Sequence, residues 1–390
     1  MYRADFPFFG NNKTIYLDSA ATSQKPQKMI DALCSFYSVQ NSNIHRGNYV
    51  LSRNAEKAFE ESRKKVADFI GANEEEIIFT KGATEALNYI ARSISNDLQD
   101  KENIVVSDLE HSSAYFPFKR ECERRNAEFR SIKVLENGTL DMNDLYEKVD
   151  EQTKLLVISG MSNVNGFKPD LEKIIAYAHE KQVPVLVDAA QLIAHEIIDV
   201  KKLDCDFLAF SAHKVYGPMG VGCLYVKKER MGQLDPLLLG GGTIEDDRYH
   251  DYPLKEGIER FEAGTADVAG VIAFGASLDY LKEKDFKKVL EYESGLSSYL
   301  HQELSKVKGL RIVGPVKNSP VVCFELQGYS SYDVGVLLSM KNIAVRCGGH
   351  CAYPMVESLK RENLVRVSLG MYNNKDDIDA LASVLKTIIR

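Results

Sequence analysis

The sequence predicts an α/β protein in which a mostly parallel sheet is covered by helices and a smaller α+β domain follows. The first two-thirds of the chain alternates short apolar runs with amphipathic helical patterns, an order typical of a sheet covered on both faces. Several of these runs lack polar alternation, as strands buried on both faces do. After residue 270 the order changes to two successive helical patterns and then shorter strands. A length of 390 residues accommodates two such domains.

The expected elements follow in chain order. Strands are predicted over residues 76–79, 104–107, 129–134, 155–159, 183–187, 207–210 and 221–226, and helices over 25–39, 54–70, 83–95, 113–125 and 170–181. The helix over 54–70 places Ala55, Phe59 and Val66 on one face and ends at Gly71, a residue that readily adopts the left-handed C-cap.

The last third has a different pattern. Helices are predicted over 271–282, 286–306, 332–340 and 375–389, and strands over 311–313, 320–326, 343–346 and 364–369. We therefore expect a large domain over residues 16–270. Residues 1–15 and 271–390 are expected to form the small domain.

The composition argues against several classes of protein. Lys plus Arg total 49 and Asp plus Glu 56, and the net charge of −7 argues against nucleic-acid and anionic-membrane binding. No stretch approaches the ~20 apolar residues of a membrane helix, and the first residues do not resemble a secretory signal. Seven scattered cysteines indicate reduced thiols, so we expect a cytoplasmic protein.

Two residues of opposite charge at strand ends carry the strongest chemical signal. Lys214 follows the strand over 207–210, and a desolvated lysine can attack carbonyl groups as a free amine. Asp188 ends another apolar strand, and ligands of open parallel sheets bind at such ends. A lysine that forms a Schiff base and an acid that protonates a pyridine nitrogen are what pyridoxal phosphate chemistry requires. The alternatives are a surface lysine and a structural salt bridge.

Two further segments carry weaker signals. Gly82 permits a turn before a predicted helix whose first free N–H groups, at Ala83 and Thr84, form a potential anion site, although a simple capped helix is the alternative. Cys351 follows two glycines and His350, and nearby positive charge favours the reactive thiolate. A nucleophile, a redox pair with Cys347, half of a metal site and an inert thiol are the competing interpretations, and no second Cys or His pair has zinc spacing.

The chain resembles the fold-type I pyridoxal phosphate enzymes, and within their class-V aminotransferase-like group it is similar to the cysteine desulfurases of the SufS type. The resemblance spans almost the full length and rests on the order and spacing of its motifs. These are Tyr16-Leu-Asp-Ser-Ala-Ala-Thr22, Asn43-Ile-His-Arg-Gly47, Lys81-Gly-Ala-Thr-Glu-Ala-Leu-Asn88, Glu110-His-Ser112, Ser162-Asn-Val-Asn-Gly166, Val187-Asp-Ala-Ala-Gln191, Ser211-Ala-His-Lys-Val-Tyr-Gly-Pro218, Arg260-Phe-Glu-Ala-Gly-Thr265, Arg346-Cys-Gly-Gly-His-Cys-Ala352 and Arg366-Val-Ser-Leu-Gly-Met-Tyr-Asn373.

The resemblance implies a role for each site residue. Catalysis would fall to Lys214, Cys351 and His111, the last stacked on the cofactor ring. The cofactor would be held by Ala83, Thr84, Asn163, Asp188, Gln191, Ser211 and His213 of one subunit and by Thr265 of its partner in a homodimer. His45, Arg346 and Arg366 would line the substrate pocket, with Arg366 clamping the substrate carboxylate. The small domain would carry the Cys351 loop.

The implied activity is conversion of L-cysteine to L-alanine, with a persulfide on Cys351 that passes to a sulfur-acceptor protein, as in iron–sulfur cluster assembly. Ser112, Ala114, Cys347 and Gly349 depart from residues common in the family. They leave selenocysteine and cysteine sulfinate as alternative substrates. A non-catalytic scaffold in sulfur assembly is the alternative from another class, and an intact set of Lys214, Asp188 and Cys351 argues against it.

Overall fold

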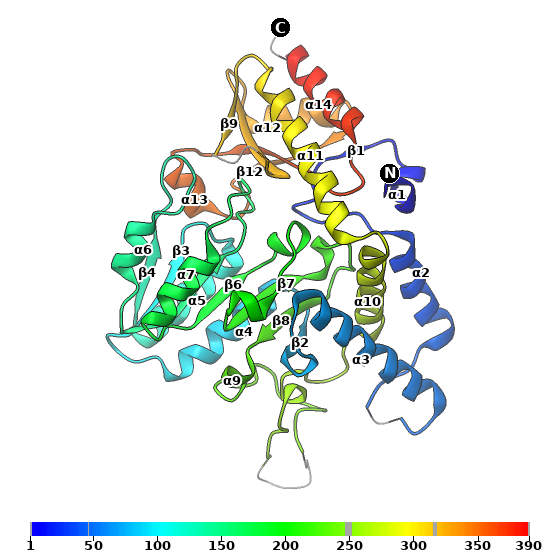
Figure 1. Cartoon of the computed structure of the whole chain (residues 1–390), viewed down its shortest axis with the longest axis vertical. Coiled ribbons are helices and arrows are strands. Elements are labelled where there is room, and N and C mark those ends of the chain that lie inside the picture. The colour runs from blue at the N-terminus through cyan, green and yellow to red at the C-terminus, as the bar shows by residue number, and fades with distance from the viewer. Residues whose placement is uncertain (1, 46, 246–251, 315–317, 389–390) are drawn as a thin grey trace.

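The computed structural model describes residues 2–45, 47–245, 252–314 and 318–388. These residues build a large part around a seven-stranded sheet and a smaller part around a four-stranded sheet (Figure 1). Among the described residues, no helix combines the length and apolar character needed to cross a membrane.

The large sheet sets the position of the site. Its strands are β2 (Ile77–Thr80), β3 (Asn103–Ser107), β4 (Glu128–Ile132), β5 (Thr153–Ser159), β6 (Val185–Asp188), β7 (Phe207–Ser211) and β8 (Gly222–Val226), in the order β2-β8-β7-β6-β5-β3-β4. The pairs from β4 to β7 are parallel, whereas β8 is antiparallel to both of its neighbours. Because β6 and β7 are adjacent and parallel, the residues that follow them meet at one edge of the sheet.

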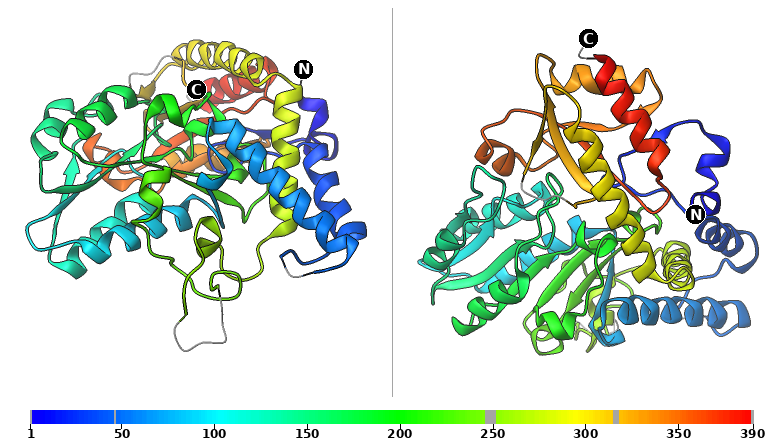
Figure 2. Two further views of the ribbon diagram at one scale, coloured as in Figure 1. Left: turned by 60° about the horizontal axis from the view of Figure 1, so that its bottom comes forward. Right: turned by 45° about the horizontal axis from the view of Figure 1, so that its top comes forward.

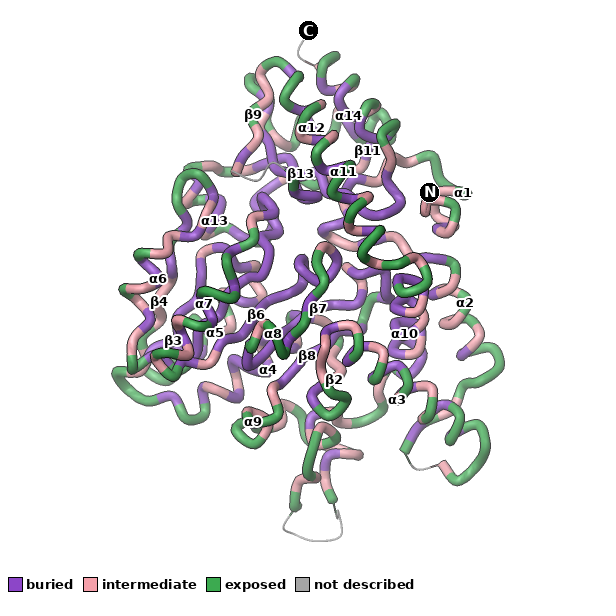
Figure 3. Tube along the Cα trace, viewed as in Figure 1, coloured by how far each residue is buried: buried purple, intermediate pink, exposed green. Residues whose placement is uncertain are grey.

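Helices bury both faces of this sheet. Leu186 of β6 packs into the core formed with α4 (Ala83–Ile94) and α5 (Ser112–Arg125), whereas Val185 and Val187 pack into the core on the other face with α7 (Leu171–Glu180) and α10 (Val268–Glu283). Successive strand residues point to opposite faces, so an uninterrupted apolar run is needed to fill both cores. The central strands are accordingly buried, while the outer surfaces of the helices are exposed (Figure 3).

The smaller part is an antiparallel sheet covered by helices. Its strands lie in the order β12 (Arg346–Gly348), β13 (Leu364–Ser368), β10 (Val321–Leu326) and β9 (Leu310–Val313). Its apolar core contains residues of α11 (Phe286–Ser305), α12 (Ser331–Ser339) and α14 (Lys375–Ile388). Figure 2 shows α11 and α14 side by side. Near the N-terminus, β1 (Ile15–Tyr16) pairs with β11 (Ile343–Ala344), which brings the following residues next to β13.

The remaining helices are α1 (Phe8–Asn11), α2 (Gln27–Ser35), α3 (Val50–Ile70), α6 (Met142–Lys148), α8 (Val200–Leu203), α9 (Lys228–Met231) and α13 (Tyr353–Ser358). The predicted α/β class is confirmed, and each predicted strand and helix overlaps an observed element. One strand predicted over 343–346 is instead two, β11 and β12. The short strand β1 and the short helices α1, α6, α8, α9 and α13 were not predicted. The predicted domain boundary at residue 270 falls within α10, a helix that packs against α2 and α3. The boundary stays a prediction.

Candidate active site

A cavity of about 270 Å³ lies where β6 and β7 end, facing the loop that follows β12. It brings together most of the predicted site residues. These are Ala83, Thr84, His111, Asn163, Asp188, Gln191, Ser211, His213, Lys214, Arg346, Cys351 and Arg366. His45 and Thr265 are exposed and do not line the cavity. His45 instead faces Glu56, with its Nδ1 3.3 Å from the carboxylate. Within one chain, His45 therefore does not reach the substrate pocket where it is predicted to lie.

Asp188 and Lys214 both line the cavity, and the charge of each group acts on the pKa of the other. Asp188 is the last residue of β6 and is buried, and its Oδ1 accepts a hydrogen bond from the Ala190 N–H at 2.9 Å. Burial raises the pKa of Asp188, partly opposed by that hydrogen bond and by Lys214. Burial lowers the pKa of Lys214 to about 8, partly opposed by Asp188. A buried lysine with this pKa has an accessible free-amine form near neutral pH, as carbonyl chemistry requires.

His111 and Gln191 approach the cavity from two different elements. His111 is the N-cap of α5, and its ring accepts a hydrogen bond from the Ser113 N–H at 3.2 Å. Burial, followed by the positive charges of Lys214 and Arg366, lowers the pKa of His111 to about 4, so the ring is neutral at pH 7. Gln191 follows β6 and donates to the Ala20 carbonyl at 2.8 Å, which fixes its amide at the cavity wall.

The start of α4, where an anion site is predicted, lines the cavity, but the N–H of Ala83 is not free as expected. Ala83 is the first residue of α4 and its N–H donates to Ser211 Oγ at 2.8 Å, which joins the helix N-terminus to the end of β7. Gly82 has φ 154°, and a Cβ added to the neighbouring Gly222 would lie 2.4 Å from the Cα of Gly82. Two glycines are therefore required for the close approach of these segments. The unpaired N–H groups and the dipole of a helix N-terminus favour an anion such as phosphate.

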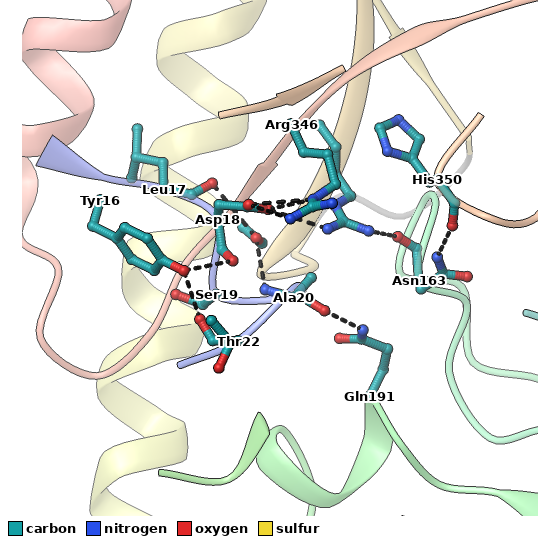
Figure 4. A network of polar contacts seen from close by, with 12 residues as sticks. Tyr16, Leu17, Asp18, Ser19, Ala20, Thr22, Asn163, Gln191, Arg346 and His350 are labelled. Carbon is teal, nitrogen blue, oxygen red and sulfur yellow. Dashed lines mark hydrogen bonds and ion pairs between the residues drawn. The ribbon is translucent and has the colours of Figure 1, made fainter. Parts of the chain in front are cut away.

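Arg366 and Arg346 also line the cavity, and Figure 4 shows Arg346 beside Asp18. Arg366 is buried in β13, and its Nη1 donates to the Asn163 carbonyl at 2.9 Å. Its Nη2 donates to Asp18 Oδ1 at 3.2 Å, and Arg346 donates to the same carboxylate. The Nε–H of Arg366 is buried and has no partner among the described residues. A substrate carboxylate in the cavity would satisfy such a buried donor, because a guanidinium offers a fork of N–H groups.

The cysteine loop closes the cavity. Cys351 is exposed at the cavity wall, and it and His350 both have left-handed backbones, with φ of 54° and 53°. Hydrogen bonds to their carbonyl groups hold this turn: Asn163 Nδ2 donates to His350 at 2.7 Å, and the N–H of Ser112 donates to Cys351 at 2.7 Å.

Cys347 points away from the cavity. It lies in β12 directly after Arg346, so its side chain emerges on the opposite face of the sheet. Its Sγ packs against Gly335 of α12, where an added Cβ would lie 2.5 Å from the sulfur. Burial raises the pKa of Cys347 to about 11, so the reactive thiolate is disfavoured there. The geometry separates the two cysteines of the motif, which spacing alone left open.

The cofactor expected at this site is pyridoxal phosphate, and the residues present fit it. A buried carboxyl group, an amine with a lowered pKa, a neutral imidazole and a helix N-terminus line one cavity of small-molecule size. The Nδ1 of His213 is buried without a hydrogen-bond partner among the described residues. This nitrogen is therefore free to form a hydrogen bond with a group bound beside the predicted anion site.

Sequence reasoning did not assign roles to Asp18, Ser112 or Glu110. All three lie inside the quoted motifs. Asp18 contacts Arg366 and Ser112 contacts Cys351, partners that are far away in sequence, whereas Glu110 accepts a hydrogen bond from nearby Ser107. Asp18 could have been noticed because it is an acid in the N-terminal motif. Two arginines are expected at the site, and an acid could serve as their counter-ion.

Comparison with known proteins assigns the chain to a family. The model of the class-V aminotransferase family matches residues 15–381, and the chain belongs to this family. A curated relative from Cronobacter sakazakii, named cysteine desulfurase, is 39% identical over 400 residues, covering 100% of this chain and 97% of the relative.

Solved structures agree with this class. The apo structure of a cysteine desulfurase from Thermococcus onnurineus NA1 has a TM-score of 0.95 and 35% identity, covering 99% of this chain and 97% of that one. The cysteine desulfurase CsdA from Escherichia coli, in an S-sulfonic acid form, has a TM-score of 0.93 and 33% identity, covering 100% and 97%. The predicted family and fold class are confirmed, and the SufS type stays a prediction.

Proposed function

We propose that the protein is a pyridoxal phosphate-dependent cysteine desulfurase that converts L-cysteine to L-alanine and keeps the sulfur as a persulfide on Cys351. The observation that carries this proposal is the convergence of Lys214, Arg366 and Cys351 on one cavity. Full-length similarity to proteins named cysteine desulfurase supports it. A non-catalytic scaffold would not require an amine, a carboxylate clamp and a thiol to meet.

The residues around the cavity divide into a cofactor end and a substrate end. Pyridoxal phosphate, when bound, supplies the electron sink that stabilises negative charge at the substrate's Cα. Asp188 would hold the pyridine nitrogen in its protonated form, and Gln191 would donate to the phenolic oxygen. The start of α4, with Ser211 and His213, would hold the phosphate.

At the substrate end, Arg366 orients the amino acid by its carboxylate, with Arg346 and Asn163 beside it. With the substrate held in this way, the amine of Lys214 would attach the cofactor at rest and would accept the proton released from the substrate's Cα. His111 lines the same cavity and is neutral at pH 7; it would cover the face of the cofactor ring and exchange a proton there. Burial lowers the pKa of Lys214 and thereby favours the free amine, the form that accepts a proton.

Cys351 carries out the sulfur step. Its thiolate forms an S–S bond to the substrate's sulfur while the substrate's Cβ–S bond breaks, and the electron pair of that bond remains with the substrate carbon. Protonation of the carbon skeleton then gives alanine, and Cys351 retains the transferred sulfur. The exposure of Cys351 leaves this sulfur accessible to a second thiol.

We also propose a homodimer and a protein that accepts the sulfur, within the cytoplasm, for iron–sulfur cluster assembly or another sulfur-transfer pathway. His45 and Thr265 are exposed and outside the cavity of their own chain, which supports their contribution to the site of a second subunit. All seven cysteines are free, which supports a reducing compartment.

The test is product analysis with the cofactor-loaded protein and L-cysteine. The natural chain and Cys347→Ala should release alanine at similar rates, whereas Cys351→Ala should lose this activity. Mass analysis should place one added sulfur on the peptide that carries Cys351. Equal alanine release from Cys351→Ala and the natural chain, or an added sulfur on Cys347, would overturn the assignment of the nucleophile. Parallel assays with selenocysteine and cysteine sulfinate would rank the alternative substrates.

A further inference from the structure

Lys25 is a partly buried lysine that the proposed mechanism does not use. It lies between the N-terminal motif and α2, and its Nζ donates a hydrogen bond to the His213 carbonyl at 2.9 Å, outside the cavity. Burial lowers the pKa of Lys25 to about 7, and no carboxylate among the described residues opposes this effect. Because an amine is rarely removed from water without an acidic partner, the position of Lys25 calls for an explanation.

The carbonyl group of His213 receives four hydrogen-bond donors from one short segment. Thr22 Oγ1 lies 3.2 Å from its oxygen, Ser23 Oγ and the Ser23 N–H each lie 3.0 Å away, and Lys25 Nζ lies 2.9 Å away. A carbonyl oxygen has two lone pairs, so the capacity of this oxygen is filled. Lys25 makes the shortest of these contacts and is the only donor among them that can carry a charge, which strengthens a hydrogen bond.

This carbonyl group belongs to the peptide unit that leads into Lys214. Because a peptide unit is planar, holding the His213 oxygen also constrains the nitrogen and the Cα of Lys214, from which the amine-bearing side chain extends. On the other side of Lys214, the Tyr216 N–H donates to Ser23 Oγ at 2.9 Å, and Tyr216 has a left-handed backbone with φ 67°. The turn that carries Lys214 is therefore held at both ends by the same segment.

The stretch of chain over residues 18–25 also contacts two residues that line the cavity. Asp18 Oδ1 accepts a hydrogen bond from Arg366 Nη2 at 3.2 Å, and the Ala20 carbonyl accepts one from Gln191 Nε2 at 2.8 Å (Figure 4). One continuous segment thus links the arginine proposed to hold the substrate carboxylate to the turn that carries the amine. This link matters because a displacement of about 1 Å between reacting groups slows an enzymatic step by about 100-fold.

We propose that Lys25 is a positioning residue that, through the His213 carbonyl, holds the amine of Lys214 where it takes the proton released from the substrate's Cα. The proposal rests on the proposed function and adds a residue to it. In this step the electron pair of the Cα–H bond stays with the carbon, and the proton binds the lone pair of the Lys214 amine. Lys25 itself exchanges no proton with the substrate, since its Nζ lies outside the cavity.

The test follows the exchange of the Cα proton of L-alanine for deuterium in D2O, a reaction that requires the Lys214 amine but not Cys351. NMR gives the exchange rate of each cofactor-loaded protein, expressed per bound cofactor. Lys25→Met should slow the exchange about tenfold, the scale of one lost hydrogen bond from a charged donor. Lys25→Arg retains an N–H donor and should stay within about threefold of the natural rate. Lys28→Met removes the lysine of a surface ion pair with Glu283 and should stay within about twofold.

A binding measurement separates positioning from a merely structural role. Titration of L-alanine into the same samples, followed by the visible absorbance of the cofactor, gives its affinity. Lys25→Met should leave this affinity within about twofold, because Arg366 holds the carboxylate, whereas a general distortion of the site would weaken binding and exchange together. Lys25→Gln is polar and shorter, should behave as Lys25→Met does, and takes its place if that variant does not fold.

Natural exchange rates in Lys25→Met and Lys25→Gln would overturn the proposal. Equal slowing in Lys25→Met and Lys25→Arg, or a parallel loss of alanine affinity, would also overturn it. Failure of the proposed function gives a different result, because the natural chain would then exchange the alanine proton but release no alanine from L-cysteine. The comparison among the variants would still decide the role of Lys25.

Discussion

The carbonyl group of Cys351 accepts two hydrogen bonds from Ser112, one from the backbone N–H at 2.7 Å and one from the side-chain hydroxyl at 2.8 Å. Ser112 is the first residue of α5 and directly follows His111. The loop that carries Cys351 is thereby attached to α5, whose N-cap residue His111 lines the same cavity. A left-handed backbone at two consecutive non-glycine residues is unfavourable, so such anchors help to keep this turn in place.

Ser112→Ala should loosen the loop without removing the thiol. The variant loses one of the two hydrogen bonds, worth about 1 kcal/mol or roughly a fivefold change in the population of the open loop. The rate at which iodoacetamide alkylates Cys351 should therefore rise about fivefold, as followed by mass analysis. Ser112→Thr retains the hydroxyl and should react near the natural rate. Equal alkylation of all three proteins would show that the hydroxyl does not hold the loop.

Lys214→Ala should abolish covalent attachment of the cofactor. The amine of Lys214 is the buried amine that lines the cavity beside Asp188, and its lowered pKa favours the free base. Borohydride reduction of the natural protein should fix the cofactor's mass on the peptide that carries Lys214. The variant should show no such adduct and no alanine formation. Lys25 provides the matched control, because burial lowers its pKa too, to about 7, but its amine donates to the His213 carbonyl at 2.9 Å outside the cavity. A cofactor adduct on Lys25 in the natural chain would contradict the assignment.

The fold was predictable because its signals are local. Buried parallel strands appear as apolar runs, and Gly71 takes the left-handed C-cap with φ 72° that its position indicated. Asp188 and Lys214 could be paired because the carboxyl ends of neighbouring parallel strands meet, a rule that needs no long-range knowledge. Their roles in catalysis remain predictions.

The contacts between the two sheets were not predictable in the same way. Asp18 reaches Arg366 only because β1 pairs with β11, a match between segments more than 300 positions apart that no periodicity reveals. The opposite orientations of Cys347 and Cys351 depend likewise on where β12 ends. Spacing placed both thiols on one loop, but strand alternation sends Cys347 into the small-domain core.

Asp188→Asn should retain bound cofactor but lose most of its turnover. The amide keeps the size and the acceptor oxygen of the side chain, whereas it cannot stabilise a protonated pyridine by charge. Loss of one preorganised electrostatic contact should lower kcat by about 100-fold or more. Alanine formation and cofactor content measured on the same sample separate the two effects. Asp206→Asn is a suitable control, since Asp206 is equally buried but pairs with His179 and Arg230 outside the cavity. Near-normal turnover in Asp188→Asn would remove the carboxylate from the mechanism.

Glu110 provides a prediction about stability and pH. Its side chain is fully buried, Oε1 accepts a hydrogen bond from Ser107 Oγ at 2.6 Å, and Oε2 has no partner among the described residues. Burial, reinforced by the nearby Asp188 carboxylate, raises the pKa of Glu110 to about 8. The folded protein therefore keeps this proton up to about pH 8, whereas an unfolded chain releases it at about pH 4.3.

The sign of the pH effect follows from this difference. Between these two values the folded state binds more protons, so the stabilising contribution of Glu110 is fully present below about pH 4.3 and is lost as the pH rises toward 8. The loss is at most about 1.4 kcal/mol per pH unit for one proton. Glu110→Gln keeps the shape of the protonated side chain and cannot ionise. The Tm of this variant minus that of the natural protein should therefore increase from pH 5.5 to pH 8, measured by thermal unfolding in matched buffers. Glu61→Gln, at an exposed position of α3, should show no such trend. If the Tm difference for Glu110→Gln is the same at both pH values, Glu110 is ionised in the folded protein and its proposed neutral state is wrong.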